Sequence, residues 1–298
     1  MALLFDVPDI KKVRVILDTD AACEADDPFA IVHALLSPKL IVKGIVAEHF
    51  NKEGSVERSL EEIKTILKAM ELESKIPYFL GEEGPYKEGS DVSVVSEGVD
   101  FIISEAKRED EHPLFVLCQG AITNVAAALR KDPSIASGMT VVWIGTHGKA
   151  PSTTPWREFN SGNDVLSANY ILESAVKLWL IPSNVYITVN VGIATLQKKV
   201  YPCGKIGRHL FEQLVAYNNS EEAGWTKGES WSLGDSPAVA VTLNPDCGTY
   251  EYVKAPYIND ETVSVENPSG RMIRLYTSVD SNYILDDLFS KLSLCYPE

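Results

Sequence analysis

Short apolar runs alternate with amphipathic stretches along most of the chain. The run Val13–Leu17 is apolar and β-branched and ends in acidic residues, which indicates a buried strand. A helix is expected at Pro28–Leu36, because proline suits a first helical turn and apolar residues recur on one face. Leu40–Ala47 predicts a second buried strand, and Ser55–Met70 a long amphipathic helix.

The same alternation continues towards the C-terminus. The pattern predicts helices at Asn124–Leu129 and Val165–Ser174, and further strands at Leu114–Cys118, Thr140–Ile144, Val176–Leu180 and Val185–Val189. Strands that alternate with helices predict an α/β fold with a mostly parallel central sheet flanked by helices on both faces. No linker interrupts the pattern, so residues 1–298 are expected to form one domain.

Two segments rich in small and polar residues interrupt the alternation. Gly145–Arg157 is rich in Ser, Thr, Pro and Gly, and Asn218–Ser236 in Asn, Ser and Gly. Both are expected to be long loops, and long loops in compact domains are often functional.

Composition restricts the classes of partner. Hydrophobic residues make up 45% and charged residues 23% of the 298 residues, as in ordinary soluble proteins, and the formal net charge is −15. A surface this acidic repels phosphate backbones, so nucleic-acid polymers are not expected as partners. No apolar run approaches the roughly 20 residues that span a bilayer, and no signal peptide is recognisable at the N-terminus.

The cysteines favour a reducing compartment. They are odd in number and scattered without metal-like pairing, at Cys23, Cys118, Cys203, Cys247 and Cys295. We therefore expect a cytoplasmic protein that has no membrane partner.

The most informative segment for chemistry is LDTDAACEADDP, residues 17–28, where the first strand gives way to the first helix. It holds five carboxylates within ten residues: Asp18, Asp20, Glu24, Asp26 and Asp27. Such groups repel one another unless a cation lies among them, and hard divalent cations prefer oxygen ligands. Ligands bind at the carboxyl ends of strands in open α/β sheets. By itself the segment is equally consistent with a solvated acidic loop at a helix start, and its spacing excludes an EF-hand.

This segment resembles the signature D-T-D-x-G-x-D-D of the inosine-uridine preferring nucleoside hydrolases. The chain departs from that signature by two extra residues and by the absence of the glycine. Four further stretches resemble family motifs in the same order: Gly44–Asn51 (GIVAEHFN), Gln119–Asn124 (QGAITN), Glu158–Asn160 (EFN) with Asp164 and Ala168, and Gly234–Ala238 (GDSPA). The resemblance covers residues 13–245 and implies a nucleoside hydrolase-like, Rossmann-like fold.

Carried over motif by motif, the resemblance implies a calcium site. Its ligands would be Asp20, Asp27, the backbone carbonyl of Thr123, and Asp235. A water on the ion would be the nucleophile, and Asp20 would be the base that removes its proton. Asp18 would support the loop.

The resemblance also implies a ribose site formed by Asp26, Asn51, Glu158 and Asn160. Carboxylates and amides are natural partners for vicinal hydroxyls, and contacts that strengthen in an oxocarbenium-like state promote cleavage. Without the family pattern, these residues would be ordinary strand ends, caps and polar loop positions. Glu24 belongs to the insertion and has no family counterpart.

The pattern departs from the family on the side of the leaving group. The family commonly has a histidine before the late aspartate, and here that position is Gly234. His49 and His147 follow predicted strands and are possible substitutes as leaving-group acids, although lone histidines are more often structural. Trp156 and Trp231 lie in the long loops, where they would either stack on a base or anchor the loop.

The sequence therefore predicts a calcium-dependent enzyme that hydrolyses the N-glycosidic bond of a small ribonucleoside to ribose and free base. Two alternatives stay open: a hydrolase of another glycoside or ribosyl derivative, and a metal-dependent sugar-binding protein without turnover. A haloacid dehalogenase-type phosphatase also has D-x-D after its first strand, but the T-N and E-F-N motifs have no place in it. By family resemblance, a homodimer or homotetramer is expected.

Overall fold

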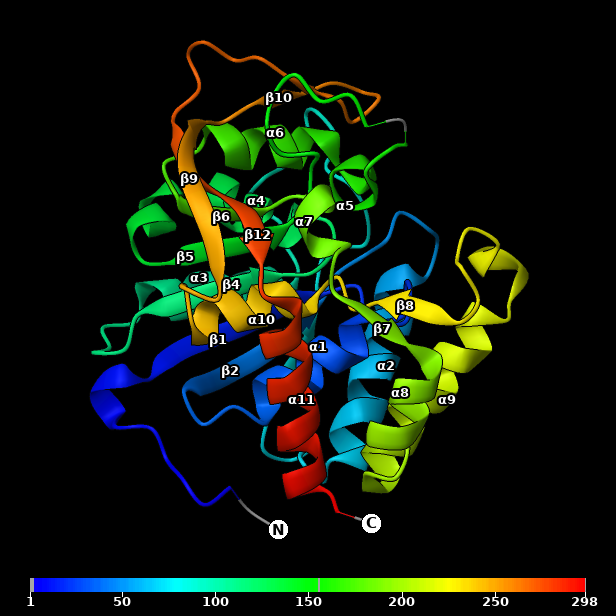
Figure 1. Cartoon of the computed structure of the whole chain (residues 1–298). Helices are drawn as coiled ribbons and strands as arrows, with labels where there is room; N and C mark the ends of the chain where they lie inside the picture. The colour runs from blue at the N-terminus through cyan, green and yellow to red at the C-terminus, as the bar shows by residue number, and fades with distance from the viewer. Residues whose placement is uncertain (1–2, 155, 298) are drawn as a thin grey trace.

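The computed structural model describes residues 3–154 and 156–297. Its centre is an eight-stranded sheet in the order β3-β2-β1-β4-β5-β6-β12-β9 (Figure 1). Neighbouring strands are parallel except at one edge, where β9 runs antiparallel to β12. The strands are β1 Val13–Thr19, β2 Leu40–Ala47, β3 Tyr78–Leu80, β4 Leu114–Cys118, β5 Thr140–Ile144, β6 Lys177–Ile181, β9 Gly248–Lys254 and β12 Met272–Val279.

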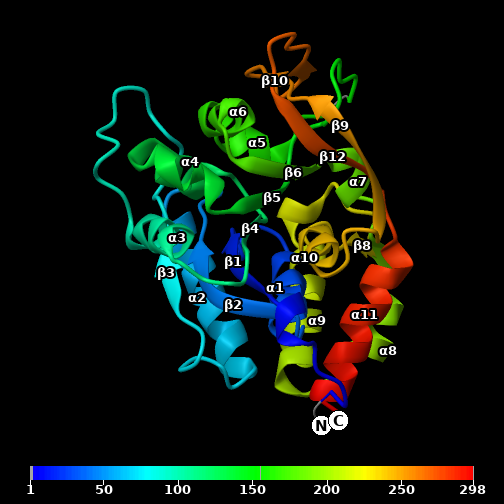
Figure 2. The same cartoon turned by 90° about the vertical axis from the view of Figure 1, so that its left-hand side faces the viewer.

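Helices cover both faces of the sheet, as Figure 2 shows edge-on. One core contains side chains from α1 Asp27–Leu35, α2 Ser55–Ala69, α8 Ile193–Lys199, α9 Gly204–Asn218, α10 Ser236–Leu243 and α11 Ser281–Cys295. The opposite core contains those of α3 Glu97–Lys107, α4 Thr123–Lys131 and α6 Val165–Glu173. The expected mostly parallel α/β sheet with helices on both faces is therefore confirmed.

Strand β1 occupies the middle of this arrangement. All seven of its residues are buried, and β2 and β4 pair with it on either side. Its apolar residues Val15, Ile16 and Leu17 divide between the two cores, as a parallel strand covered on both faces requires. This placement brings the acidic segment that follows Thr19 to the carboxyl edge of the sheet, beside the loops that follow the neighbouring strands.

Most elements predicted from the hydrophobic pattern are confirmed. The strands expected at Leu40–Ala47, Leu114–Cys118 and Thr140–Ile144 have the observed bounds, and Val13–Leu17 lies inside β1. The four predicted helices and the strand predicted at Val176–Leu180 differ from the observed elements by one or two residues at their ends. The described residues of the expected loop Gly145–Arg157 contain no helix or strand.

The strand expected at Val185–Val189 is wrong. After Pro182 the chain forms the short helix α7 Ser183–Tyr186, in which the N–H groups of Val185 and Tyr186 both bond to the Pro182 carbonyl. These local bonds replace strand pairing, and Val185 and Val189 are both buried in the core. The pairing strand begins only at β7, Asn190–Gly192.

The expected loop Asn218–Ser236 has some regular structure of its own. It contains a 3₁₀ turn at Glu221–Ala223 and the strand β8, Ser230–Ser232, which pairs antiparallel with β7. Smaller elements elsewhere are α5 Phe159–Asn163, β10 Tyr257–Ile258, β11 Ser264–Val265, and 3₁₀ turns at Asp9–Lys11 and Pro133–Ser137.

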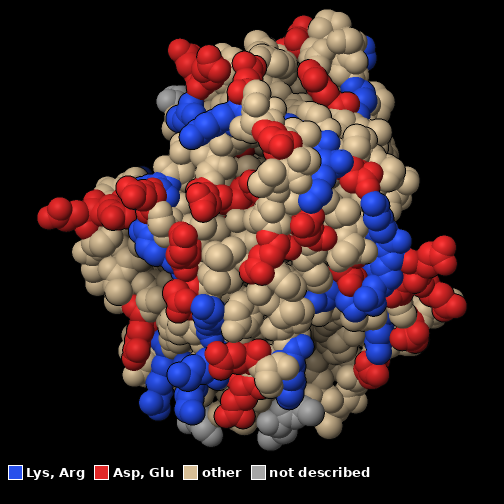
Figure 3. Space-filling view, turned by 180° about the vertical axis from the view of Figure 1, so that it is seen from behind, with Lys and Arg blue, Asp and Glu red and all other residues tan. Residues whose placement is uncertain are grey.

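Two properties of the whole molecule bear on its partners. Acidic and basic side chains are interspersed over the face that Figure 3 shows, rather than separated into large fields of one sign. Among the described residues, no helix is long and apolar enough to cross a membrane.

A buried ion pair connects the central strand to the helix layer. Arg14 of β1 donates to the side chain of Glu105 in α3 at 3.1 Å and to its carbonyl at 3.0 Å, and both side chains are almost fully buried. We expect Arg14→Met to lower the free energy of unfolding by about 3 kcal/mol, because the buried Glu105 carboxylate then keeps only the half-exposed Arg108, at 3.3 Å, as an ion-pair partner. Urea unfolding measures this change. Lys149→Met, which breaks the exposed pair with Glu251, is the control and should have almost no effect; equal losses in both variants would contradict the prediction.

Candidate active site

The carboxylates of three aspartates meet beside the N-termini of two helices. Asp26 immediately precedes α1, Asp27 is its first residue, and Asp235 immediately precedes α10. Proline follows at the start of each helix, and neither preceding aspartate uses its side chain to cap its helix. The three side chains are buried, and one oxygen from each lies within 4.8 Å of the others. This is a candidate metal centre formed by residues more than 200 positions apart in the sequence.

Asp20 lies at the end of the first strand, next to this group. It is buried, its Oδ2 has no hydrogen-bond partner among the described residues, and a Cβ at Gly120 would come within 2.7 Å of its Cγ. Burial raises the pKa of Asp20 well above its ordinary value, and the charges of Asp27 and Glu24 raise it further. A buried carboxylate oxygen without a partner, among other carboxylates, favours a bound cation.

The other members of the group have the same electrostatic character. Burial raises the pKa of Asp27 to about 6, although Thr19 Oγ1 donates to its Oδ1 at 2.5 Å and opposes that shift. The pKa values of Asp26 and Asp235 are also raised, first by burial and then by neighbouring carboxylates. The residues therefore fit a hard divalent cation, since each is an oxygen donor and their hydrogen bonds do not offset the effect of burial on their ionised forms.

Glu24, the inserted residue, turns towards the aspartates. Burial raises its pKa to about 7, and the charge of Asp27 contributes. Its own charge raises the pKa of Asp20, Asp26 and Tyr186. The insertion therefore adds a carboxyl group to the site instead of lengthening a solvent-exposed loop.

A polar network holds the N-terminus of α4 against the first strand. Asn124 Nδ2 donates to Asp18 Oδ1 at 2.8 Å, and the Asn124 backbone N–H donates to Glu48 Oε2 at 3.2 Å. Burial raises the pKa of Asp18 to about 7 and that of Glu48 well above its ordinary value. Sequence reasoning missed Glu48; its signal was an acidic residue directly after a buried strand.

Thr123 and His49 belong to the same network. Thr123 Oγ1 donates to Asp164 Oδ2 at 2.8 Å and lies 2.8 Å from His49 Nε2. His49 Nδ1 accepts the backbone N–H of Asn51 at 3.1 Å, so the proton of the neutral ring is on Nε2. Burial lowers the pKa of His49 to about 4. Both ring nitrogens are engaged, and His49 has no nitrogen left for a leaving group.

The side chain of Asn51 is available for a ligand. Asn51 is exposed, has a left-handed backbone (φ 55°), and makes no side-chain hydrogen bond to another described residue. Asn160, by contrast, is buried and donates from Nδ2 to the Ile144 carbonyl at 2.9 Å, while its Oδ1 makes no hydrogen bond to another described residue.

Glu158 is buried and caps α5 at the end of the long loop. Its Oε1 accepts from the Asn160 N–H at 3.2 Å and from the Tyr186 hydroxyl at 2.8 Å. Its Oε2 accepts from the Thr146 N–H at 2.8 Å and from both the N–H and the hydroxyl of Ser161 at 2.8 and 2.5 Å. Five donors therefore saturate a carboxylate that has about four acceptor sites.

His147 and Trp156 pack on each other as loop anchors. The Nδ1 of His147 lies 2.7 Å from Ser183 Oγ, its Nε2 lies 2.8 Å from the Trp156 carbonyl, and the two rings are edge to face at 4.7 Å. Both nitrogens of His147 are therefore engaged, as in His49. The Trp156 ring remains partly exposed.

Trp231 is buried and packs against Tyr217 of α9 at 5.6 Å between ring centroids. Burial raises the pKa of Tyr217, and the charges of Glu24, Cys23 and Asp26 raise it further, so Tyr217 lies near the acidic segment. Trp231 is thus a support behind Tyr217, and Tyr217 is the aromatic residue that sequence reasoning missed.

Gly234 lies between Asp26 and Tyr186. A Cβ at this position would be 3.2 Å from Asp26 Oδ2 and 3.2 Å from Tyr186 Cδ2. The room that a larger side chain would need at position 234 is therefore limited by the tyrosine ring. Tyr186 lies within Val185–Val189, the segment wrongly predicted as a strand, which is why sequence reasoning missed it.

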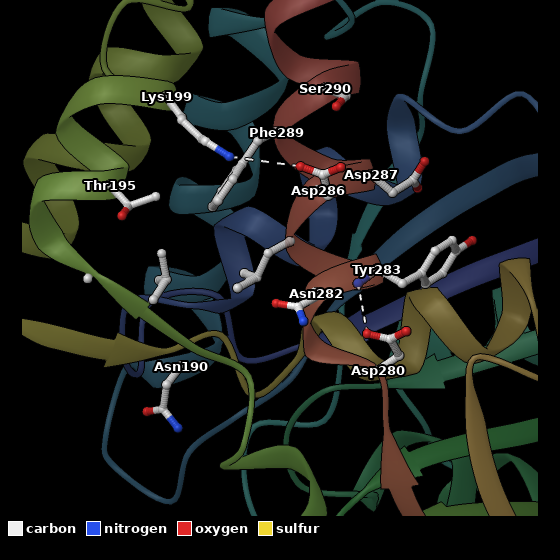
Figure 4. Close-up of a pocket in the computed structure, with 13 residues that line it drawn as sticks. Asn190, Thr195, Lys199, Asp280, Asn282, Tyr283, Asp286, Asp287, Phe289 and Ser290 are labelled. Atoms are coloured by element: carbon white, nitrogen blue, oxygen red, sulfur yellow. Dashed lines mark hydrogen bonds and ion pairs between the residues drawn. The ribbon is translucent and has the colours of Figure 1, made fainter.

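A groove on the described surface lies away from these residues. It runs between α8 and α11, has a volume of about 660 Å³, and is lined by residues such as Thr195, Lys199, Asn282 and Asp286 (Figure 4). Lys199 Nζ and Asp286 Oδ1 approach to 3.8 Å across it. None of the clustered aspartates lines this groove, so it is separate from the candidate active site.

Comparison with known proteins agrees with this geometry. The family model described as inosine-uridine preferring nucleoside hydrolase matches residues 15–283. An uncharacterized protein of Schizosaccharomyces pombe is 24% identical over 262 residues, 78% of this chain and 81% of that protein. The pyrimidine-specific ribonucleoside hydrolase RihA of Escherichia coli O1:K1 is 24% identical over 259 residues, 79% of this chain and 81% of its own length.

Solved structures of nucleoside hydrolases share the fold. The plant nucleoside hydrolase PpNRh1 superposes with a TM-score of 0.75 at 20% identity, covering 94% of this chain and 98% of its own. A purine-preferring ribonucleoside hydrolase from Gardnerella vaginalis gives a TM-score of 0.75 at 22% identity, covering 95% and 99%. Since the family model spans most of the sequence, the chain belongs to the inosine-uridine preferring nucleoside hydrolase family and is an N-glycosyl hydrolase.

Proposed function

We propose that this enzyme hydrolyses the N-glycosidic bond of a ribonucleoside, with calcium, to give ribose and the free base. The observation that carries the proposal is the convergence of Asp26, Asp27 and Asp235 next to the unpartnered buried oxygen of Asp20. In a nucleoside hydrolase, a group of this kind suits a cation and a sugar together.

The calcium ion would be held by Asp20, Asp27, Asp235 and the backbone carbonyl of Thr123. When bound, calcium supplies positive charge that offsets the carboxylates and acidifies a coordinated water. Asp20 is the proposed base that takes the proton of the attacking water, and its buried Oδ2, which has no hydrogen-bond partner among the described residues, is available for that role. Asp18 is held by Asn124 and has the supporting role.

The sugar would be oriented by Asp26, Asn51, Asn160 and Glu158. The unbonded Oδ1 of Asn160 and the exposed amide of Asn51 are available to hydroxyl groups. Hydroxyl contacts that strengthen as the sugar acquires oxocarbenium character would lower the barrier.

The leaving group is the part of the proposal that departs from the family pattern. Neither His49 nor His147 has a ring nitrogen free, and position 234 is glycine. We therefore propose that the base departs without a histidine acid. Tyr217, and the partly exposed ring of Trp156, are the aromatic groups that would contact it.

A second candidate is hydrolysis of another glycoside or ribosyl derivative by the same apparatus, and a third is sugar binding without turnover. Glu24 and Gly234 favour the second candidate over the third, because they alter the site beside the aspartates without removing Asp20. A substrate panel should contain pyrimidine and purine nucleosides, since relatives are named for either class.

The remaining parts of the proposal concern the setting of the enzyme. We propose a homodimer or homotetramer that acts in the cytoplasm on small nucleosides, which sedimentation and fractionation would check. Among the described residues, Cys23, Cys118, Cys247 and Cys295 form no disulfide, and the net charge of −15 disfavours polynucleotide partners.

Asp20→Asn tests the proposed base. We expect kcat/KM for uridine or inosine to fall about 100- to 10,000-fold, because the amide cannot accept the proton. In cation-free buffer the melting temperature should not fall, since burial disfavours the ionised form of Asp20 and the amide cannot ionise. Reducing-sugar release and thermal melting measure the two effects, with the exposed Asp246→Asn as control. Turnover at the wild-type rate would contradict the role of Asp20.

Removal of the cation tests the metal centre. We expect chelation to abolish turnover and calcium to restore it better than magnesium, because the site offers several oxygen ligands. Calcium at about 100 times its Kd should also stabilise the fold by about 2.7 kcal/mol, and Asp235→Asn should remove most of that gain. Full activity after exhaustive chelation would rule out the proposed role of the ion.

Glu24→Gln tests the inserted carboxyl group through pH. In the folded protein the pKa of Glu24 is about 7, above its ordinary value of 4.5. The protonated carboxyl therefore contributes fully to the free energy of unfolding below pH 4.5, and this contribution is lost as the pH rises through 7. In cation-free buffer we expect Glu24→Gln to match wild type at about pH 4 and to be more stable at about pH 8, by up to about 3 kcal/mol. Melting curves across pH measure this, with exposed Glu212→Gln as control. A difference from wild type that does not change with pH would refute the prediction.

A further inference from the structure

The inference concerns Tyr186 and rests on the proposed function. It begins with the saturation of Glu158, the residue expected to hold a sugar hydroxyl. Four of its five donors come from its own and the adjacent loop: the N–H groups of Thr146, Asn160 and Ser161, and the Ser161 hydroxyl. These donors fix the carboxylate and close α5. A sugar hydroxyl would have to displace one of them in order to reach Glu158 directly.

The fifth donor is different, because it comes from another element. The Tyr186 hydroxyl, at the end of α7, donates to Glu158 Oε1 at 2.8 Å. A phenol has one proton and acceptor lone pairs on the same oxygen, so this bond commits the proton and leaves the oxygen able to accept. No other hydrogen bond of the Tyr186 hydroxyl occurs within residues 3–154 and 156–297.

Tyr186 also borders the metal side of the site. Its ring carbon Cδ2 is the neighbour that a Cβ at Gly234 would meet at 3.2 Å, and the other neighbour at that distance is Asp26 Oδ2. The charges of Glu158, Glu24 and Asp235 all bear on the phenol, and together with burial they raise its pKa well above the ordinary value. The hydroxyl therefore stays protonated and remains a donor to Glu158.

We propose that Tyr186 is the residue that meets the sugar on this side of the site, and that Glu158 acts through it as a positioning residue. The phenolic oxygen accepts a hydrogen bond from one sugar hydroxyl, and the ring fills the space beside Gly234. The site therefore selects ribosides that have a free hydroxyl at that position, because the committed phenol cannot donate to an ether or a hydrogen-free substituent there.

The test compares sugar preference in wild type and Tyr186→Phe. The substrates are uridine and inosine with their 2′-, 3′- and 5′-deoxy analogues, assayed with calcium. We expect Tyr186→Phe to lower kcat/KM for the full ribonucleosides by about 10-fold or more, and to leave one deoxy analogue almost unaffected. The preference of wild type for that one hydroxyl should disappear, which a purely structural loss of activity would not produce. Exposed Tyr257→Phe is the matched control and should change nothing.

A second variant tests the space beside Gly234. Gly234→Ala would press a methyl group against the tyrosine ring and Asp26, and should reduce the same hydroxyl preference several-fold; Gly84→Ala, where a Cβ meets nothing within 4 Å, is its control. Melting curves with calcium show whether each variant is folded and binds the ion. If Tyr186→Phe lowers activity equally for all sugars, or for none, the inference is overturned.

The inference and the proposed function can fail separately. If wild type cleaves no nucleoside, the proposed function is wrong, and the sugars are then compared by the rise in melting temperature that each produces. Loss of one hydroxyl's contribution in Tyr186→Phe would still support the inference. Identical shifts in both proteins, or no shift with any sugar, would overturn it.

Discussion

The structure depends on one electrostatic constraint, the burial of several carboxylates in one place. Asp20, Asp26, Asp27 and Asp235 are all nearly inaccessible, and burial together with mutual repulsion disfavours their ionised forms. Such a group persists only when a rigid framework holds it and a cation can offset its charge. The parallel sheet supplies that framework, since β1 is buried along its whole length and the two helix starts are packed against each other.

Much of the surrounding polar structure follows from this constraint. Position 120 requires glycine, because a Cβ there would lie 2.7 Å from the Cγ atom of Asp20. Asp18 and Glu48 use their oxygens to hold Asn124 at the start of α4, and His49 stays neutral as a link between Asn51 and Thr123. Asp18, Glu48 and His49 therefore have structural roles, since each forms hydrogen bonds that hold a loop following a strand.

The site divides into a part that follows the family pattern and a part that does not. The aspartates and the asparagines lie in the stretches that resemble family motifs, and Asp26, Asp27 and Asp235 form a group that could hold a cation. The residues that depart from the family pattern are Glu24 and Gly234, and both lie close to Tyr186. The tyrosine ring limits the space at position 234, because a Cβ there would lie 3.2 Å from Tyr186 Cδ2.

The sequence by itself determined the local elements and the chemistry of the acidic segment. Apolar periodicity identified β1, β2, β4 and β5, and the family motifs identified the aspartates, because both signals lie in short stretches of chain. Tertiary structure alone decided what reaches the site from other elements. After Pro182 the chain forms the short helix α7 where the pattern predicted a strand. As a result, Tyr186 contacts Glu158 and lies beside Gly234. The saturation of Glu158 and the engagement of both histidines were also invisible in the sequence, since hydrogen bonds between distant residues depend on how parallel strands are ordered in the sheet.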